Sequence, residues 1–416
     1  MPSCIFHVDA NSAYLSWEAA SRLQHGDMLD LRTVPAVVGG SQETRHGIIL
    51  AKSIPAKKYG IQTGESVFEA RAKCPNLIVV PPNYSLYMQC SQAFGDILRK
   101  YSPVVEQYSI DEYFMDYTGS ERTFGDPLSM AYRLKEEIKE ELGFTVNIGI
   151  SSKKLLAKMG SELQKPDKVH TLFPEEIPSK MWPLPVEELF GVGRATSRKL
   201  RDRSICTIGD LAHTDPILLN LFLKSYGTLL WNFANGRDDS PVHLTRRVPV
   251  KGMGNSTTIA FDVEDSRTAH LVLLSLTETV GARLREGGYC ARLVSVSIRT
   301  NQLISYSHQR KIHTPTDCTN TIHAIACELF DDIWGHEPIR HLGVRVSDLC
   351  NNSFIQMTLF ERESEKQRAA DRAIDQIRSR YGSGAIIRAT FLHSGLAPIT
   401  GGTVTDEEYP MMTSLL

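Results

Sequence analysis

Three acidic residues stand where apolar runs end or meet. Asp9 closes the run CIFHVD at 4–9, and the pair Asp111 and Glu112 lies inside the β-rich stretch VVEQYSIDEYFMDY at 104–117. Carboxylates that converge at strand ends suit hard cations such as Mg²⁺, which prefer oxygen ligands. Two such ions about 3.5–4 Å apart stabilise both the attacking and the leaving oxygen of a phosphoryl transfer. The three acids therefore predict two-metal phosphoryl transfer, and a solvated turn is the alternative for the pair.

The elements around these acids are predicted in an order that would bring them together. Hydrophobic periodicity favours strands at 4–9, 34–38, 47–51, twice within 104–117 and at 145–150, and helices at 13–23, 84–100, 127–142 and 152–164. Without the first long connection, the order is strand, helix, strand, strand, helix, strand, the split βαβ or ferredoxin-like arrangement. Its first and third elements can be neighbours, so the three acids can converge. The roughly seventy residues of that connection indicate an inserted subdomain.

The second half of the chain has a different texture. Gly191-Val192-Gly193 precedes a helical stretch that carries five basic residues, Arg194, Arg198, Lys199, Arg201 and Arg203. Residues 236–252 combine glycine, proline and basic residues, which predicts an exposed linker. Residues 255–347 predict a second α/β unit, with helices near 268–286 and 317–333 and a strand at 291–300. One more amphipathic helix is expected at about 364–381.

Bulk properties describe an ordinary globular protein of several domains. The chain has 416 residues, of which 42% are hydrophobic and 23% charged, and its net charge is −2, so any DNA contact must come from local basic patches. Eight cysteines without a C-x-x-C pair indicate neither a zinc site nor a disulfide framework. We find no signal peptide and no apolar stretch long enough to cross a bilayer, so we expect a cytoplasmic protein with no membrane partner.

Two segments give the sequence a family resemblance. HVDANSAY at 7–14 and YSIDEYF at 108–114 resemble the two palm motifs of Y-family DNA polymerases, and the likeness covers about residues 3–350. It implies a template-directed, low-fidelity DNA polymerase for translesion synthesis, which adds dNTPs to a primer 3′-hydroxyl and serves DNA damage tolerance and repair. The implied partners are primer–template DNA and dNTPs, and the implied state is a monomer.

The resemblance also implies how the chain is divided. The fold class would be a multidomain α/β (α+β) protein with a ferredoxin-like βαββαβ palm, small inserted fingers, a helical helix–hairpin–helix thumb and an α/β little finger. The implied bounds are 1–11 with 84–170 for the palm, 12–83 for the fingers, 171–238 for the thumb, 239–249 for a linker, 250–350 for the little finger and 351–416 for a tail. Fingers this small would check base-pair shape loosely, which allows damaged templates and costs fidelity.

Carried over by position, the resemblance assigns the catalytic residues. Asp9, Asp111 and Glu112 would hold two Mg²⁺ ions, for which Mn²⁺ is an alternative, and the Ala10 carbonyl would be a further ligand. Glu112 would lie nearest the primer 3′-hydroxyl. Tyr14 matches the steric gate, whose ring excludes a ribose 2′-hydroxyl; a core aromatic is the alternative.

The implied nucleotide contacts follow the family pattern only in part. Lys165, in QKPDK, matches a lysine that contacts the incoming triphosphate as a point charge. In SIPAKKYGI at 53–61, Ile54 replaces a tyrosine of the family and Lys57 replaces an arginine. Ile54 offers no hydrogen-bond donor, and Lys57 offers charge without the bidentate fork of arginine. We therefore predict a weaker hold on the nucleotide; for each lysine, a solvated position is the alternative.

The turn at Gly191 and Gly193 resembles a helix–hairpin–helix motif. Its backbone N–H groups can approach a DNA phosphate, and Arg194 and Lys199 behind it add attraction that does not depend on base sequence. A tight structural turn is the alternative. In the second α/β unit, Arg292 and Arg299 flank an alternating strand that the resemblance assigns to duplex binding.

A short motif near the end of the chain predicts a protein partner. Gln356, Leu359 and Phe360, in QMTLF at 356–360, resemble the pentapeptide that binds a sliding clamp. Such a motif places Leu and Phe in an apolar pocket, and Gln fixes its register. A strand or a tail packed on its own domain is the alternative.

Two other functions fit parts of the sequence. A palm-fold nucleotidyl cyclase would share the topology and the metal chemistry, but it would need neither the glycine turn nor the second α/β unit. A non-catalytic DNA-binding module would explain Ile54, although all three acids are intact. Within the family, the DNA polymerase IV type and the catalytic subunit of a mutagenesis polymerase both fit.

Overall fold

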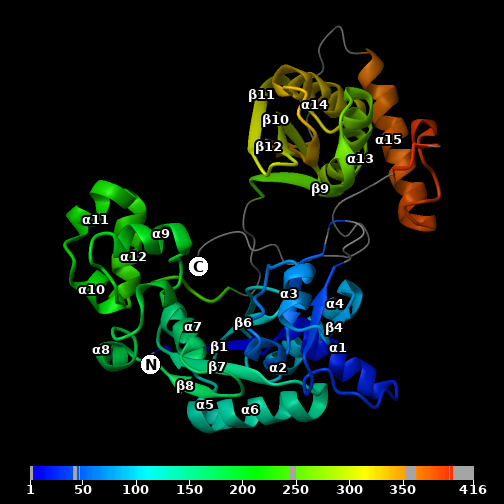
Figure 1. The fold of residues 1–416 in the computed structure, drawn as a ribbon. Coiled ribbons are helices and arrows are strands. Elements are labelled where there is room, and N and C mark those ends of the chain that lie inside the picture. Colours follow the sequence, from blue (N-terminus) through cyan, green and yellow to red (C-terminus); the bar gives the residue numbers. More distant parts are fainter. Residues whose placement is uncertain are drawn as a thin grey trace. The chain divides into compact units, whose positions relative to one another are not determined.

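The chain forms two compact units, each with a hydrophobic core of its own. Figure 1 shows the computed structural model, in which residues 3–40, 45, 47–243, 250–352, 362–392 and 394–396 are described. Of these, 3–40 and 48–243 belong to the first unit, and the remainder belong to the second.

A five-stranded sheet forms the centre of the first unit. Its order is β5-β6-β1-β7-β8, formed by β1 (Ile5–Ala10), β5 (Val105–Gln107), β6 (Glu112–Asp116), β7 (Val146–Ser151) and β8 (Val169–Thr171). The middle strand, β1, runs antiparallel to both β6 and β7, and β8 lies parallel to β7. With α4 (Tyr84–Arg99), α5 (Glu121–Phe124) and α6 (Pro127–Leu142) in the connections, β1, β5, β6 and β7 have the predicted ferredoxin-like order, and β8 extends it.

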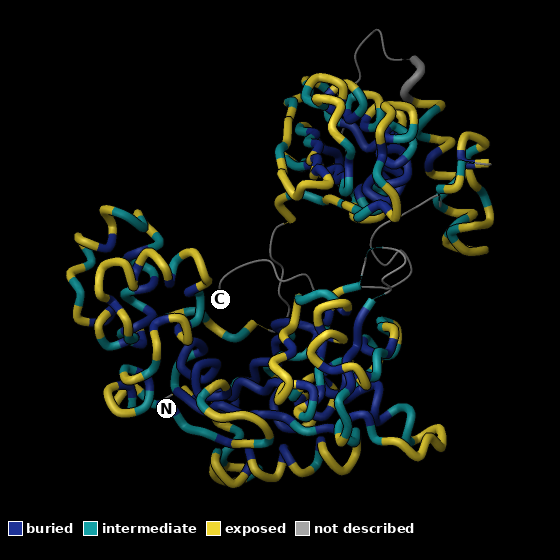
Figure 2. Tube along the Cα trace, in the orientation of Figure 1, coloured by how far each residue is buried: buried dark blue, intermediate teal, exposed yellow. Residues whose placement is uncertain are grey.

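The middle strand is buried along its whole length, and Figure 2 shows the sheet as the darkest part of this unit. Phe6 and Val8 point into the main core, while Ile5 lies on the opposite face, which α7 (Lys154–Glu162) covers. α7 packs closely because β7 carries Gly149, where a Cβ would stand 1.9 Å from the carbonyl oxygen of Ala157. This packing brings the side chains of α7 to the end of β1.

The long connection after β1 carries a sheet of its own, as its length predicts. It begins with α1 (Ala13–Gln24), which packs into the main core. The sheet has the order β3-β2-β4 and is formed by β2 (Ala36–Gly39), β3 (Ile49–Lys52) and β4 (Ile78–Val80), with the helices α2 (Ile54–Lys58) and α3 (Val67–Lys73). Its separate small core includes Val37, Ile49 and Ile61.

Residues 174–234 are mainly helical. The helices are η1 (Pro174–Glu176), α8 (Ile177–Lys180), η2 (Val186–Glu188), α9 (Arg194–Arg201), α10 (Ile208–His213), α11 (Pro216–Leu223) and α12 (Ser225–Ala234). Their shared core includes Leu155, Leu156 and Met159 of α7. α7 therefore packs against the sheet on one side and against this helical region on the other.

The second unit is a four-stranded antiparallel sheet with two long helices. The sheet has the order β11-β10-β12-β9 and is formed by β9 (Gly252–Val263), β10 (Tyr289–Thr300), β11 (Ser305–Thr316) and β12 (Ile339–Asn351). Both α13 (Ser266–Glu286) and α14 (Thr319–Ile333) contribute to its core. The last elements are α15 (Arg362–Tyr381) and η3 (Ala389–Phe391).

α15 packs against α13 of its own unit. Arg285 of α13 pairs with Asp375 at 2.5 Å and with Asp371 at 3.3 Å, and Glu278 pairs with Arg378 and with Arg388. The sequence alone indicated the helix but no intramolecular partner for it. Among the described residues, every helix is too short or too polar to span a bilayer.

Candidate active site

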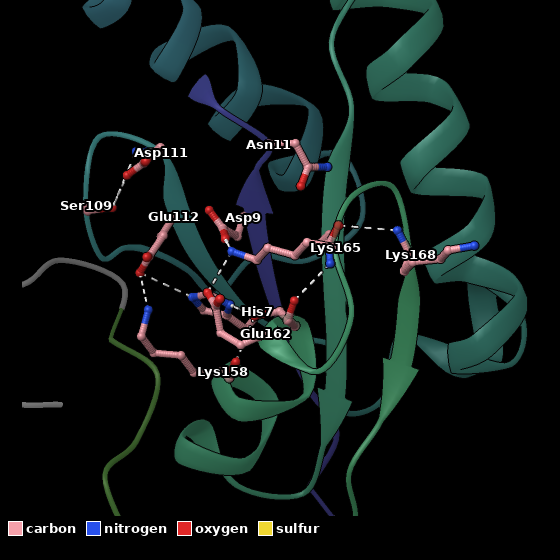
Figure 3. A network of polar contacts seen from close by, with 12 residues as sticks. His7, Asp9, Asn11, Ser109, Asp111, Glu112, Lys158, Glu162, Lys165 and Lys168 are labelled. Atoms are coloured by element: carbon pink, nitrogen blue, oxygen red, sulfur yellow. Dashed lines mark hydrogen bonds and ion pairs between the residues drawn. The ribbon is translucent and has the colours of Figure 1, made fainter. Parts of the chain in front are cut away.

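Asp9 and Glu112 face each other across the two central strands. They are directly paired in the register of β1 and β6, and Ala10 N donates a hydrogen bond to the Asp111 carbonyl at 2.9 Å. Only 7% of the Asp9 side chain and 16% of the Glu112 side chain are exposed. Figure 3 shows both carboxylates at this end of the sheet. Strand pairing alone therefore brings together two acids that are far apart in the sequence.

Asp111 stands in the turn just before β6, and its carboxylate is oriented differently. Its Oδ1 accepts a hydrogen bond from Ser109 Oγ at 2.6 Å. Figure 3 shows this side chain directed toward Ser109 rather than toward Asp9. The turn is held by the Glu112 carbonyl, which accepts from the N–H groups of Tyr108 at 2.9 Å and Ser109 at 3.2 Å. Burial raises the pKa of Asp111, and the hydrogen bond from Ser109 opposes this shift.

Two lysines neutralise the acid pair. Lys158, on α7, donates to Glu112 Oε2 at 2.5 Å. Lys165, just after α7, donates to Asp9 Oδ2 and also to Glu162 Oε1, the latter at 2.7 Å. The close approach of α7 to the sheet therefore supplies one counter-charge, and the segment that follows α7 supplies the other.

His7 lies two residues before Asp9 on the same face of β1, and it is fully buried. Its Nδ1 is 2.7 Å from Ser161 Oγ, and its Nε2 is 3.4 Å from Glu112 Oε2. Burial and the charge of Lys158 lower the pKa of His7 to about 4, so the ring is neutral at pH 7.

The two acids respond to this environment in opposite ways. Burial raises the pKa of Asp9 to about 7; Lys165 opposes the shift and Glu112 adds to it. Burial also raises the pKa of Glu112, but His7 and Lys158 outweigh it and hold that pKa at about 2. Glu112 is therefore a fixed negative charge, whereas the charge on Asp9 depends on a nearby cation.

The donor set fits a divalent ion by its chemistry. Carboxylate oxygens are the ligands that Mg²⁺ and Mn²⁺ prefer, and a cation beside Asp9 would favour its charged form. Across the described part of the chain, no three His, Cys, Asp or Glu side chains surround one point as metal ligands do. In this arrangement lysine ammonium groups meet Asp9 and Glu112, and Asp111 turns to Ser109.

Tyr14 lies in the first turn of α1, close along the chain to Asp9. Ser12, at the start of this helix, has a left-handed φ of 49°, and Ser16 Oγ donates to the Asn11 carbonyl at 2.6 Å. The half-buried Tyr14 ring stacks on Tyr87 with centroids 4.4 Å apart.

The segment that departs from the family pattern forms the helix α2, which packs beside the three-stranded sheet. Ser53 caps the helix by accepting a hydrogen bond from Ala56 N at 3.0 Å. Ile54, at its first position, is 52% exposed, and Lys57 is exposed too. Burial and the charge of Lys57 lower the pKa of Lys52, which indicates a basic local surface.

The glycine turn sits where the sequence places it, directly before α9. Gly191 has φ 92°, which favours glycine, and Tyr226 Oη donates to its carbonyl at 2.6 Å. Gly193 begins the helix in open space, with Arg194 and Lys199 exposed behind it. The turn is therefore held on one side by Tyr226 and open to solvent on the other.

The other residues predicted to bind DNA or a clamp do not belong to the first unit. Arg292 and Arg299 are exposed on β10 in the second unit. The clamp motif with Gln356, Leu359 and Phe360 lies outside the described residues.

Lys158 and His7 were not identified as site residues from the sequence. The period of two along a strand places His7 on the face of Asp9. Lys158 lies on the helix that the sequence predicts at 152–164, just before Lys165. Both signals were present, but neither residue type is a preferred Mg²⁺ ligand.

The sequence matches three family models that together span most of its length. These are the impB/mucB/samB family over residues 8–162, the family's helix–hairpin–helix motif over 174–203, and the impB/mucB/samB family C-terminal domain over 250–359.

Similar proteins cover nearly the whole chain. DNA polymerase IV of Clostridium acetobutylicum is 46% identical over 393 residues, which is 94% of this chain and 99% of that protein. DNA polymerase IV of Acetivibrio thermocellus is 38% identical over 94% of this chain and 98% of its own. DNA polymerase IV 2 of Bacillus subtilis is 36% identical over 93% of this chain and 94% of its own.

Solved structures share the fold. A Y-family DNA polymerase chimera superposes with a TM-score of 0.71 at 21% identity, over 84% of this chain and 100% of its own. DinB from Sulfolobus solfataricus superposes with a TM-score of 0.54 at 21% identity, over 83% of this chain and 98% of its own.

Proposed function

Because this chain belongs to the impB/mucB/samB family of Y-family DNA polymerases, we propose that it copies damaged templates by low-fidelity, two-metal translesion synthesis. The chain is a DNA-directed DNA polymerase of that family. The finer proposal is that it adds dNTPs to a primer 3′-hydroxyl opposite lesions, as part of DNA damage tolerance and repair in the cytoplasm. The nucleotidyl cyclase alternative is wrong, because the family match covers the second unit as well as the first.

The pairing of Asp9 with Glu112 across β1 and β6 carries this proposal. We assign Asp9, Asp111, Glu112 and the Ala10 carbonyl as ligands of two Mg²⁺ ions. When bound, such ions offset the charge that develops on the attacking and leaving oxygens. Asp111 has to turn from Ser109 toward Asp9 to take part, a movement confined to one side chain in a turn.

The lysines prepare the site for a charged substrate. Lys158 and Lys165 balance two of the three acids, which reduces the cost of burying their charges. Lys165 is the more exposed, at 35% of its side chain, and can move from Asp9 to a triphosphate. Lys158, at 10%, stays with Glu112 and fixes its orientation.

Two departures from the family pattern support weaker nucleotide binding. Ile54 stands exposed at the start of α2 where the family has a tyrosine, so that hydrogen bond to the triphosphate is lost. Lys57 keeps the positive charge of the family's arginine but makes no bidentate contact. The proposed result is a raised KM for dNTPs with the metal site intact.

The remaining parts are proposed to hold DNA and the clamp. The turn at Gly191 and Gly193, with Arg194 and Lys199, would bind the phosphate backbone as a thumb. Residues 1–11 with 84–170 would form the palm, 12–83 the fingers, and 250–350 the little finger, joined by the 239–249 linker. QMTLF at 356–360 would bind a sliding clamp, and the chain would act as a monomer.

Primer extension tests the proposal directly. Purified wild-type protein, a primed DNA template, four dNTPs and Mg²⁺ should give extension, and Asp111→Ala should abolish it. Asp116→Ala is the matched control, since Asp116 ends the same strand β6 but accepts its hydrogen bond from Thr118 N, away from the site. Extension by Asp111→Ala at the wild-type rate would refute the metal assignment. A wild-type protein that binds primed DNA without extending it would support the non-catalytic alternative.

A further inference from the structure

A buried aromatic cluster lies behind Tyr14, and the proposed catalysis gives it no role. The Tyr14 ring stacks on Tyr87 with centroids 4.4 Å apart and planes 8° from parallel. Trp17 and Tyr84 contact the same ring with centroid distances of 5.9 Å and 6.3 Å. Tyr87 is fully buried, on α4, which packs against α1 (Figure 1). The surface against which Tyr14 lies is therefore part of the main core.

An acid from the same helix as Tyr14 holds Tyr87 in place. The Tyr87 hydroxyl donates to Glu18 Oε1 at 2.9 Å, and Glu18 is only 6% exposed. Glu18 follows Tyr14 by four residues on α1, so both side chains lie on one face of the helix. Arg22, one turn further on, brings its Nε to 3.7 Å from Glu18 Oε2. α1 thus contacts Tyr87 at two points, at its ring through Tyr14 and at its hydroxyl through Glu18.

The simplest role for Glu18 is to hold the Tyr87 ring in a fixed position. A buried carboxylate is costly unless it is hydrogen-bonded, and packing alone would be served by an apolar residue. A hydrogen bond to a charged acceptor is shorter and stronger than one to a neutral group, so it fixes the donor more tightly. Glu18 therefore fixes Tyr87 more tightly than packing would, and the stack passes this constraint on to Tyr14.

We propose that Tyr87 and Glu18 are positioning residues for sugar selection, because they hold the Tyr14 ring where it meets a ribose 2′-hydroxyl. This inference rests on the proposed role of Tyr14 as steric gate. A steric gate excludes ribose by contact with its 2′-hydroxyl, so the Tyr14 ring must not move away when the sugar approaches. With Tyr87 behind it, the ring cannot retreat without breaking the stack. A displacement of about 1 Å is enough to change such a fit a hundredfold.

The experiment compares the insertion of dCTP and CTP opposite a template guanine by the full-length protein. The ratio of the two kcat/KM values is the sugar discrimination. We expect it to fall about a hundredfold in Tyr14→Ala and about tenfold in Tyr87→Leu, which loses the stack. Tyr87→Phe and Glu18→Gln keep the ring and lose the hydroxyl or the charge, so their discrimination should fall about threefold.

Tyr101→Phe is the matched control. Tyr101 also donates its hydroxyl to a glutamate, Glu137, and lies in the same core beyond the other end of α4, about 20 Å from Tyr87 along the helix. Its discrimination should equal that of the wild type. This comparison separates positioning from stability, since a merely structural role lowers dCTP and CTP insertion equally and leaves their ratio unchanged.

Each outcome decides one of the two assignments. Wild-type discrimination in Tyr87→Leu, Tyr87→Phe and Glu18→Gln, beside a fall in Tyr14→Ala, would refute the inference and leave the gate standing. Wild-type discrimination in Tyr14→Ala would refute the gate and the inference with it. Should Tyr87→Leu fail to fold, the near-isosteric Tyr87→Phe and Glu18→Gln decide the result.

Discussion

Two regions of the first unit that are proposed to meet the same nucleotide differ in how firmly their residues are held. At the end of β1 and β6, Asp9 and Glu112 are directly paired and mostly shielded from solvent, and each meets a lysine from α7 or from the segment just after it. On α2, Ile54 and Lys57 are exposed. A substitution at the end of β1 and β6 disturbs a sheet, a helix and several charges, whereas a substitution at an exposed position of α2 disturbs few contacts. The chain departs from the family pattern at the exposed helix α2, so the proposed loss of nucleotide affinity would leave metal binding unchanged.

The largest effect is expected from the buried region. Asp9→Asn removes a charge that the proposed ions need, so primer extension should fall about a thousandfold. Steady-state insertion of a single dNTP measures this loss. A rate within tenfold of the wild type would show that the pairing of Asp9 with Glu112 is structural, and the contrast with α2 would lose its functional meaning.

The same variant should be more stable than the wild type in a pH-dependent manner. The pKa of Asp9 is raised to about 7, mainly by burial, so its charged form opposes folding. The resulting stability loss is absent below the unfolded pKa, grows as the pH rises and is complete above the folded pKa. Asp9→Asn should therefore raise the melting temperature by about 3 °C at pH 8 and hardly at all at pH 4.5. Equal shifts at both pH values would contradict this account.

The packing of α7 on the sheet is the next strongest constraint. Gly149→Ala places a Cβ 1.9 Å from the Ala157 carbonyl oxygen, so α7 has to move, at a cost of about 3 kcal/mol. Denaturant unfolding measures the cost. Gly193→Ala is the control, because a Cβ there meets nothing within 4 Å. Since α7 carries Lys158, extension by Gly149→Ala should also fall; full stability with full activity would show that α7 does not position the site.

The sequence predicts the buried strands of the first unit better than its short or exposed elements. The apolar run CIFHVD and the acid pair at 111–112 predict the strands and the approach of Asp9 to Glu112, because buried strands leave few arrangements. The ferredoxin-like order and α6 (Pro127–Leu142) also follow from periodicity. The short β4 and β8, and the mostly exposed β11, were not predicted, because their patterns are too brief or too polar.

Side-chain geometry was less predictable than strand pairing. The direction of the Asp111 carboxylate toward Ser109 depends on a local hydrogen bond that competes with metal binding. The pairing of Lys158 with Glu112 depends on how closely α7 approaches the sheet, which Gly149 decides from another strand. Long-range contacts of this kind leave only weak traces in local patterns.

Lys165 is intermediate between the buried acid pair and the exposed helix α2, because its side chain is 35% exposed yet bonded to Asp9. In Lys165→Met the triphosphate loses one point charge, so the KM for dNTP should rise about tenfold while kcat changes less. Lys168→Met is the control, because Lys168 is exposed on the strand side of the same loop. A fall in kcat alone would instead assign Lys165 to the chemical step.

The smallest effect is expected from a substitution on α2, and it tests directly whether this exposed helix contacts the nucleotide. Ile54→Tyr restores the hydroxyl that the family uses to hold the triphosphate, so the KM for dNTP should fall about threefold at unchanged kcat. Ile54 is already 52% exposed, so a larger ring fits without repacking the small core. Ile48→Tyr is the control, since Ile48 is 47% exposed beside the same sheet but outside the matched motif. An unchanged KM in Ile54→Tyr would mean that α2 does not reach the nucleotide, and that its departure from the family pattern is neutral.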